Sequence, residues 1–378
     1  MSKKNVRLES LFILSEIISP SNDREKIKQE ILSDSINWLS VVEIANTHFL
    51  TAALYYSLLD KDLLNFIDDE ELLAYLEQIY TINLHRNQKI IEQSEEIAQI
   101  LSKKGIKPIF LKGAASLLQN DYKDIGMRFL SDIDFCITEN SLHEAINLLT
   151  STGYITNETN KSIKPVWHHW WPMSHKKWDA VLEVHRYALG YPFSQYIHCD
   201  EENFDKNFKQ MGSSVLSPTI RLIHAYIHSD LIDRNYDFKN IDLRQLYEIN
   251  IIINNYGLQI DWLYIEKKFH SYKIFDKFNY KLYLIYKLFN TETPIMKENF
   301  TAKLHLRILY LNFKYYDSFL RKIFSTNREI LHRLSYTDIR KRYNITSKKE
   351  YIYYLFRYLQ KKNIFTLYSS IFKNYFSH

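Results

Sequence analysis

The chain has 378 residues, of which 46% are hydrophobic, 15% aromatic and 25% charged, while only 7 are glycine and 7 are proline. This composition supplies enough apolar material for a large core, and the length predicts two or three domains. The scarcity of glycine argues against Rossmann and P-loop folds, since neither G-x-G-x-x-G nor G-x-x-x-x-G-K is present. Sandwiches and propellers need many glycine and proline turns, so a mostly helical fold is favoured.

The net charge of +5 is unevenly distributed along the chain. Residues 281–378 contain 19 Lys/Arg and 6 Asp/Glu, so the rest of the chain is net acidic. A basic segment of this kind attracts polyanions such as RNA, DNA or an anionic membrane surface. The alternative is an ordinary set of solvated helix faces, and it is favoured because these charges are scattered among Tyr, Phe, Ile and Leu at helical spacing.

The cysteines and the apolar runs predict a cytoplasmic protein. Cys136 and Cys199 are too few for a disulfide framework or a four-cysteine zinc site. No apolar run approaches the roughly 18–20 residues that span a bilayer. The N-terminal stretch is basic at its start but carries Glu9 and Glu16, which predicts an amphipathic helix and not a signal peptide.

Helices are predicted at both ends of the chain. Proline is absent from 21–107 and from 295–378, and both stretches repeat apolar residues at i, i+3, i+4 and i+7. Ser21–Asn22 can cap one helix, and Asp68–Asp69 can cap a longer one that stops at Gly105.

The character of the sequence changes at residue 106. The expected elements in chain order are a buried strand in the run 106–113, a short helix at 114–120, an alternating strand at 131–138, a helix at 142–152, a strand at 154–156, a β-hairpin at 166–187, and helices at 221–229, 242–255 and 262–269. We therefore expect an α+β, mostly helical fold with a small mixed sheet. Its predicted regions are an N-terminal helical region at 1–105, an α/β core at 106–200, a helical substrate-side region at 201–290 and a basic aromatic helical region at 291–378.

Three carboxylates carry the strongest chemical signal. Asp132 and Asp134 are two residues apart on a predicted strand, so their side chains project from one face. Glu183 alternates with apolar Leu182 and Val184, which places it on the polar face of a later strand. Neighbouring carboxylates repel each other unless a cation lies between them, and Mg²⁺ with substrate phosphates is the commonest such cation. Three carboxylates can hold two Mg²⁺ ions, and Mn²⁺ can replace them.

Basic residues and a glycine precede these carboxylates. Gly113 closes one strand and opens a helix, which lets backbone N–H groups approach a phosphate. Lys112 and Arg128 can add charge-assisted hydrogen bonds to phosphate oxygens. Three alternatives stay open: Lys112 extends into solvent, Arg128 is a structural ion-pair partner, or Asp132 and Asp134 lie on a solvated edge strand.

These residues resemble a known pattern. Lys112-Gly113, the segment Arg128–Asp134 and the segment Val184–Arg186 are similar to the K-G, R-x-x-S-D-I-D and L-H-W segments of a bacterial family of uncharacterised nucleotidyltransferases. That family belongs to the polymerase-β-type nucleotidyltransferase superfamily. Leu222–His228 and Arg244–Glu248 resemble its later helices, so the resemblance covers roughly 40–265. Ala114, Arg186 and Glu248 depart from the usual Ser, Trp and Asp, but none of these changes removes a metal ligand.

The resemblance implies a polymerase-β-like core in which a nucleoside monophosphate passes from an NTP to an acceptor, with Mg²⁺. It implies that Asp132, Asp134 and Glu183 are catalytic and bind the metal, and that the nucleotide contacts Lys112, Gly113, Ala114, Arg128 and Ser131. Candidate acceptor-site residues are His185, His224 and His228. For His185 a structural histidine is the favoured alternative, while His224 and His228, at i and i+4 of one helix, fit packing or the acceptor site better than a zinc site.

The acceptor itself has no signature in the sequence, and neither has the choice of NTP or the oligomeric state. The acceptor could be a small molecule, a sugar or an RNA. An alternative function is an RNA-binding module, with tRNA as one candidate, that uses the basic helices of 281–378. Near the hairpin is a cluster of His168, His169 and His175 with Trp167, Trp170, Trp171 and Trp178. Core packing is favoured for most of these residues over an aromatic wall for a base or sugar, and no cysteine supports a zinc site.

Overall fold

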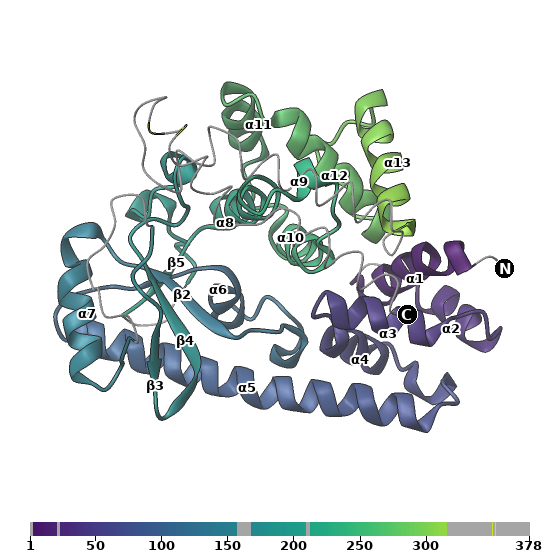
Figure 1. Cartoon of the computed structure of the whole chain (residues 1–378), viewed down its shortest axis with the longest axis horizontal. Coiled ribbons are helices and arrows are strands. Elements are labelled where there is room, and N and C mark those ends of the chain that lie inside the picture. The colour runs from purple at the N-terminus through teal and green to yellow at the C-terminus, as the bar shows by residue number, and fades with distance from the viewer. Residues whose placement is uncertain are drawn as a thin grey trace.

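A computed structural model describes residues 3–20, 23–156, 168–208 and 212–315, together with residues 350 and 352. It shows a mostly helical α+β fold with one small mixed sheet, as the sequence predicts (Figure 1). In these ranges, no helix is long and apolar enough to cross a membrane. Three expectations fall outside the described residues: the cap at Ser21–Asn22, the hairpin position of Trp167, and most of the basic region at 291–378.

Four short helices form the N-terminal region: α1 (Lys3–Ile18), α2 (Arg24–Leu32), α3 (Trp38–Thr47) and α4 (Thr51–Asp60). The cap of α2 is Asp23, whose carboxylate accepts a hydrogen bond from the backbone N–H of Glu25. Apolar faces of these helices share one core with the C-terminal helices, so the two ends of the described chain pack together.

Helix α5 (Glu70–Ser102) runs along one edge of the molecule, beneath α4 at one end and beneath the sheet at the other (Figure 1). The predicted start is confirmed, because the Asp69 carboxylate accepts a 2.9 Å hydrogen bond from the Leu72 backbone N–H. Glu70 and Glu71 stabilise the first turn, because their negative charges lie next to the positive end of the helix dipole. Beyond the last turn, Gly105 has φ +69°, a conformation that glycine adopts without steric cost.

The sheet contains five strands in the order β3-β4-β2-β1-β5. β2 pairs parallel with β4 and β1 with β5, while the β1–β2 and β3–β4 pairs are antiparallel. The strands are β1 (Ile109–Phe110), β2 (Asp132–Cys136), β3 (Met173–His175), β4 (Trp178–His185) and β5 (Ser214–Val215).

Most of the expected elements of the α/β core are present, with two corrections. The expected strand at 154–156 is reduced to a single bridge between Ile155 and Ser174, because only one residue of this segment reaches β3. Strand β5 was not expected, since its two residues, Ser214 and Val215, are too few to show a sequence period.

The two faces of β2 and β4 differ in polarity, as alternation predicts. Ile133 and Phe135 of β2, with Leu182 and Val184 of β4, are fully buried on one face. They form a second core with the C-terminal half of α5, with α6 (Lys112–Leu118) and with α7 (Leu142–Ser151). The opposite face therefore carries the polar side chains.

A run of helices follows the sheet. They are α8 (Pro218–Tyr226), a π-helical turn (Ile227–Ile232), α9 (Asn235–Phe238), α10 (Leu243–Tyr256), α11 (Trp262–Ser271), α12 (Phe275–Phe289) and α13 (Phe300–Lys314). A buried ion pair joins α12 to the π-helical turn, with Lys281 Nζ 2.7 Å from Asp230 Oδ2. The domain boundaries proposed from the sequence stay predictions.

Two buried asparagines of α5 fix the segment that leads into β2. The Asn83 side-chain amide donates to the carbonyls of Gly126 and Arg128 at 2.6 and 3.0 Å. That of Asn87 donates to the carbonyls of Ile125 and Arg128 at 2.5 and 2.6 Å. Because these carbonyls are buried, the amides replace hydrogen bonds that water would otherwise make.

We predict that Asn87→Ala destabilises the protein, because the Ile125 carbonyl loses its side-chain donor and the buried Arg128 carbonyl keeps only that of Asn83. The expected cost is about 1–3 kcal/mol in the free energy of unfolding, measured by urea denaturation. Gln88→Ala is the matched control, since Gln88 is the next residue on α5 and is exposed. Equal denaturation midpoints for the two variants would contradict the assigned role of Asn87.

Candidate active site

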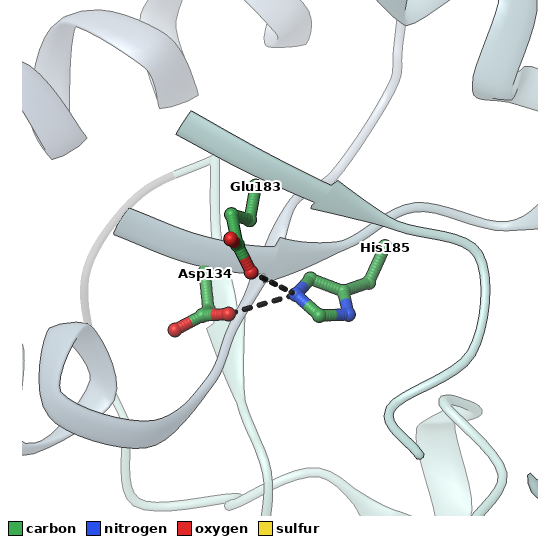
Figure 2. A group of neighbouring side chains, drawn as sticks. All are labelled: Asp134, Glu183 and His185. Atoms are coloured by element: carbon green, nitrogen blue, oxygen red, sulfur yellow. Dashed lines mark hydrogen bonds and ion pairs between the residues drawn. The ribbon is translucent and has the colours of Figure 1, made fainter. Parts of the chain in front are cut away.

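The parallel pairing of β2 with β4 brings the polar residues together. In the register of the two strands Asp134 lies beside Glu183, and Cys136 lies beside His185. Asp132, two residues before Asp134 and therefore on the same face of β2, lies beside Val181. Figure 2 shows the Asp134, Glu183 and His185 side chains converging on one point from the two strands. The predicted same-face placement of the carboxylates is therefore present.

One oxygen of Asp134 receives two donors. His185 Nε2 lies 2.8 Å from Asp134 Oδ1 and 3.7 Å from Glu183 Oε2 (Figure 2). Lys112 Nζ, at the start of α6, lies 2.8 Å from the same Asp134 Oδ1. Asp134 and His185 are buried, whereas a quarter of the Lys112 side chain is exposed. The lysine therefore reaches the carboxylates from the solvent side.

Burial and charge set the protonation of this group. Burial alone would raise the pKa of Asp134, but the hydrogen bond from His185 and the charge of Lys112 hold that pKa well below its usual value. Burial lowers the pKa of His185, so the imidazole is neutral and its Nε2–H donates to the carboxylate. Burial and the charge of Asp134 together raise the pKa of Glu183. The site thus pairs a firmly ionised carboxylate with a more basic one.

The donor set fits a divalent cation. One ligand atom each from Asp134, Glu183 and His185 lies within 4.8 Å of the others, which is close enough to share one ion. Carboxylate oxygens suit Mg²⁺ and Mn²⁺, and the His185 imidazole is compatible with Mn²⁺ once its proton moves from Nε2 to Nδ1. Asp132 is not a member of this group and is only partly buried, so its role as a ligand stays a prediction.

Lys112 lies at the boundary between the carboxylates and a pocket under α8 and α10. Its φ of +48° is unusual for a residue with a side chain and marks a locally strained backbone. Apolar and polar side chains both line the pocket beside it, and the polar ones from the helical region are Arg221, His224, His228, Gln245 and Glu248. Two of the predicted acceptor-site histidines therefore share a pocket with the predicted phosphate-binding lysine.

The two pocket histidines differ in environment. His224 is buried, its Nε2–H donates to the Ala188 carbonyl at 2.9 Å, and burial lowers its pKa to about 3. His228 is partly exposed, and its Nδ1 lies 3.0 Å from Asp233 Oδ2. His224 consequently presents a neutral ring to the pocket at neutral pH.

The other predicted nucleotide-binding residues are mostly buried. Arg128 forms an ion pair with Glu248 of α10, with 2.8 Å between Nη2 and Oε2 and about one-sixteenth of each side chain exposed. A Cβ added at Gly113 would lie 2.2 Å from Leu130 Cδ1, so the Leu130 side chain would have to shift. Ala114 is buried as well, whereas Ser131 is exposed. Their contacts with a nucleotide stay predictions, and the Arg128 geometry matches the structural alternative.

Sequence reasoning missed two histidines that border the site. The rings of His168 and His169 lie 5.3 and 5.4 Å from that of His185, measured between centroids. Burial and the nearby histidines lower the pKa of His168 to about 3. His175 packs instead against Tyr154, 4.8 Å away between ring centroids. The sequence shows that His168 is next to the predicted hairpin. Only the structure shows that its backbone pairs with the end of β4.

Carboxylates on neighbouring parallel strands of a small mixed sheet, beside a lysine, are the arrangement that the sequence resemblance implies for an enzyme of the nucleotidyl-transfer class. Comparison with protein families agrees: the model of a family described as uncharacterised nucleotidyltransferases matches residues 34–290. The chain belongs to that family and is a nucleotidyltransferase, which confirms the resemblance drawn from the sequence. No curated protein and no solved structure matches the chain. The RNA-binding alternative depends on residues that lie largely outside the described ranges and stays a prediction.

We predict that Arg128→Met destabilises the protein strongly, because it leaves Glu248 buried without its partner. The expected cost is about 3–5 kcal/mol in the free energy of unfolding. The double variant Arg128→Met, Glu248→Met should lose less than the single variant, since no unpaired charge remains. Urea denaturation of the wild type and both variants measures this. A double variant that is the less stable of the two would contradict a structural role for the pair.

Proposed function

We propose that the protein is a Mg²⁺-dependent enzyme that transfers a nucleoside monophosphate from an NTP to a hydroxyl or phosphate group of an acceptor. The observation that carries this proposal is the pairing of Asp134 with Glu183 across β2 and β4, with ligand atoms within 4.8 Å and His185 beside them. When bound, Mg²⁺ would neutralise the triphosphate and polarise the attacking oxygen, and Mn²⁺ would substitute for it.

Each carboxylate has a distinct role in this proposal. Asp132 and Asp134 would hold two ions, since they project from one face of β2. Glu183 would hold the ion nearer the acceptor, or accept the proton of its hydroxyl. The raised pKa of Glu183, caused by burial and by Asp134, makes it the better base of the two paired carboxylates.

The reaction requires no covalent intermediate with the protein. An acceptor oxygen attacks the α-phosphorus, the bond from that phosphorus to the bridging oxygen breaks, and pyrophosphate leaves. Of the predicted phosphate contacts, Lys112 is partly exposed and Ser131 is exposed. Because Lys112 lies next to the carboxylates, its ammonium group could bind the negative charge that develops on the phosphate oxygens. Positioning and charge neutralisation supply most of the rate enhancement in such transfers.

A hydroxyl group of the acceptor is proposed to enter the small pocket under α8 and α10, whose volume of about 20 Å³ has room for one such group. His224 and His228 line that pocket together with Lys112, so a group bound there would be next to the triphosphate. The buried, neutral ring of His224 suits a hydrogen bond to a hydroxyl group better than a contact with an anion. A hydroxyl acceptor is consistent with this lining.

A labelling experiment tests the reaction class. The purified protein is incubated with Mg²⁺, a cell extract and each NTP in turn, labelled with ³²P at either the α- or the γ-phosphate. Nucleotidyl transfer puts the α-label in a product that mass spectrometry can identify and leaves the γ-label in pyrophosphate. A γ-label in the product would mean phosphoryl transfer and would reject the proposal.

We predict that the double variant Asp132→Asn, Asp134→Asn loses both Mn²⁺ binding and NTP turnover, because the ligand carboxylates are gone. Turnover should fall by at least about a hundredfold. Asp179→Asn is the matched control: Asp179 lies on β4, is largely exposed and pairs with Lys89 at the surface. Mn²⁺ binding is measured by electron paramagnetic resonance. Full turnover in the double variant would show that the site is elsewhere.

A further inference from the structure

Lys112 is the cation that the carboxylate cluster already contains. Its Nζ lies 2.8 Å from Asp134 Oδ1, and in the described part of the chain no other Lys or Arg forms an ion pair with Asp134. The charges of Asp134, Glu183 and Asp132 all favour the ammonium form: burial lowers the pKa of Lys112, but these carboxylates raise it above its usual value. The protein therefore balances part of the negative charge of its own site.

We propose that Lys112 is an internal counter-cation that weakens metal binding at Asp134 until a triphosphate draws its ammonium group away. The inference rests on the proposed function and concerns the regulation of the same site. It makes the binding of the metal and of the NTP cooperative, because Lys112 is the partner that the carboxylates and the triphosphate share.

Competition between the ammonium group and a divalent ion follows from their positions. The same Asp134 oxygen that accepts from Lys112 also accepts from His185, so it has little capacity left for another cation. A positive charge within hydrogen-bond distance of a ligand oxygen repels an incoming cation. This repulsion is strong because Asp134 is only 4% exposed and water screens it poorly.

The ammonium group of Lys112 can move from Asp134 towards the pocket. The residue lines the pocket that we assign to the acceptor and is partly exposed, while its four-carbon side chain allows the ammonium group to move by several ångströms. A triphosphate next to the carboxylates offers charge-assisted hydrogen bonds in exchange for the one to Asp134. His185 stays in place when Lys112 leaves, because it belongs to β4 and is 1% exposed.

Under this exchange, loss of the ammonium group changes the metal affinity and the nucleotide affinity in opposite directions. Removing the ammonium group takes away a competitor of the metal and a partner of the nucleotide. A residue with a merely structural role would lower both affinities or neither. Reciprocity of binding free energies then requires that the nucleotide strengthens metal binding in the wild type as much as the metal strengthens nucleotide binding.

The test uses the full chain and four variants. Lys112→Met removes the charge and keeps the length of the side chain, whereas Lys112→Arg keeps the charge. Lys123→Met is the matched control, since Lys123 pairs with Asp60 at the surface with 2.6 Å between Nζ and Oδ2. Asp134→Asn removes the carboxylate on which the competition depends. Circular dichroism confirms that each variant is folded.

Two affinities are measured for each protein. The first is that for Mn²⁺ alone, by electron paramagnetic resonance of the free ion, and the second is that for each NTP at saturating Ca²⁺, by calorimetry. We expect Lys112→Met to bind Mn²⁺ about tenfold more tightly and NTP about tenfold more weakly than the wild type. Lys112→Arg and Lys123→Met should match the wild type in Mn²⁺ affinity.

The outcomes separate the two proposals. Mn²⁺ binding that is lost in Asp134→Asn but unchanged or weaker in Lys112→Met would overturn the role of Lys112 and leave the proposed function in place. Mn²⁺ binding that Asp134→Asn does not affect, or that is absent in every protein, would overturn both. An equal gain in Lys112→Met and Lys123→Met would show a general charge effect and would also reject the inference.

Discussion

The register of the parallel pair β2–β4 is the constraint on which the active site depends. It places Asp134 beside Glu183 and Cys136 beside His185, and it sends Ile133 and Leu182 together into the core. A slip of one residue would reverse the faces, because side chains alternate along a strand. Glu183 would then enter the apolar core, and the cost of burying an unpaired carboxylate opposes that arrangement. The same alternation that stabilises the sheet therefore assembles the carboxylates.

Charge compensation is the second condition for such a site. Paired carboxylates on neighbouring strands repel each other, and burial strengthens the repulsion. Here Lys112 and the neutral His185 share one oxygen of Asp134, which keeps that carboxylate ionised, while Glu183 has a raised pKa. The side chains of the protein thus offset part of the charge of the cluster, and this balance changes when a stronger cation or a competing anion arrives. The left-handed backbone of Lys112 shows that the position of this lysine has a conformational cost.

The residues that sequence patterns could identify are those whose signal is local. Alternation over Asp132–Cys136 predicted the strand and the shared face of the two aspartates, and the carboxylate of Asp69 predicted the start of α5. Resemblance of short segments predicted the family. Contacts between distant segments left no local signal: the donation of Asn83 and Asn87 to the segment before β2, the two-residue strand β5, and the approach of His168 to His185. Arg128 shows the limit clearly, since its partner Glu248 lies 120 residues away.

Buried ion pairs hold the helices of the pocket against the sheet. Arg128 joins the segment before β2 to Glu248 of α10, and Arg221 of α8 pairs with Asp121 after α6, with Tyr256 Oη 2.7 Å from the same aspartate. Such pairs contribute little net stability compared with apolar side chains of equal volume, because both charges lose their water. They do fix orientation, since a misplaced partner leaves a buried charge unsatisfied. Transfer between two bound substrates depends on positioning to within about an ångström. Apolar contacts such as that of Tyr122 with Tyr247 supply packing between the same elements, while the ion pairs fix the orientation that this positioning requires.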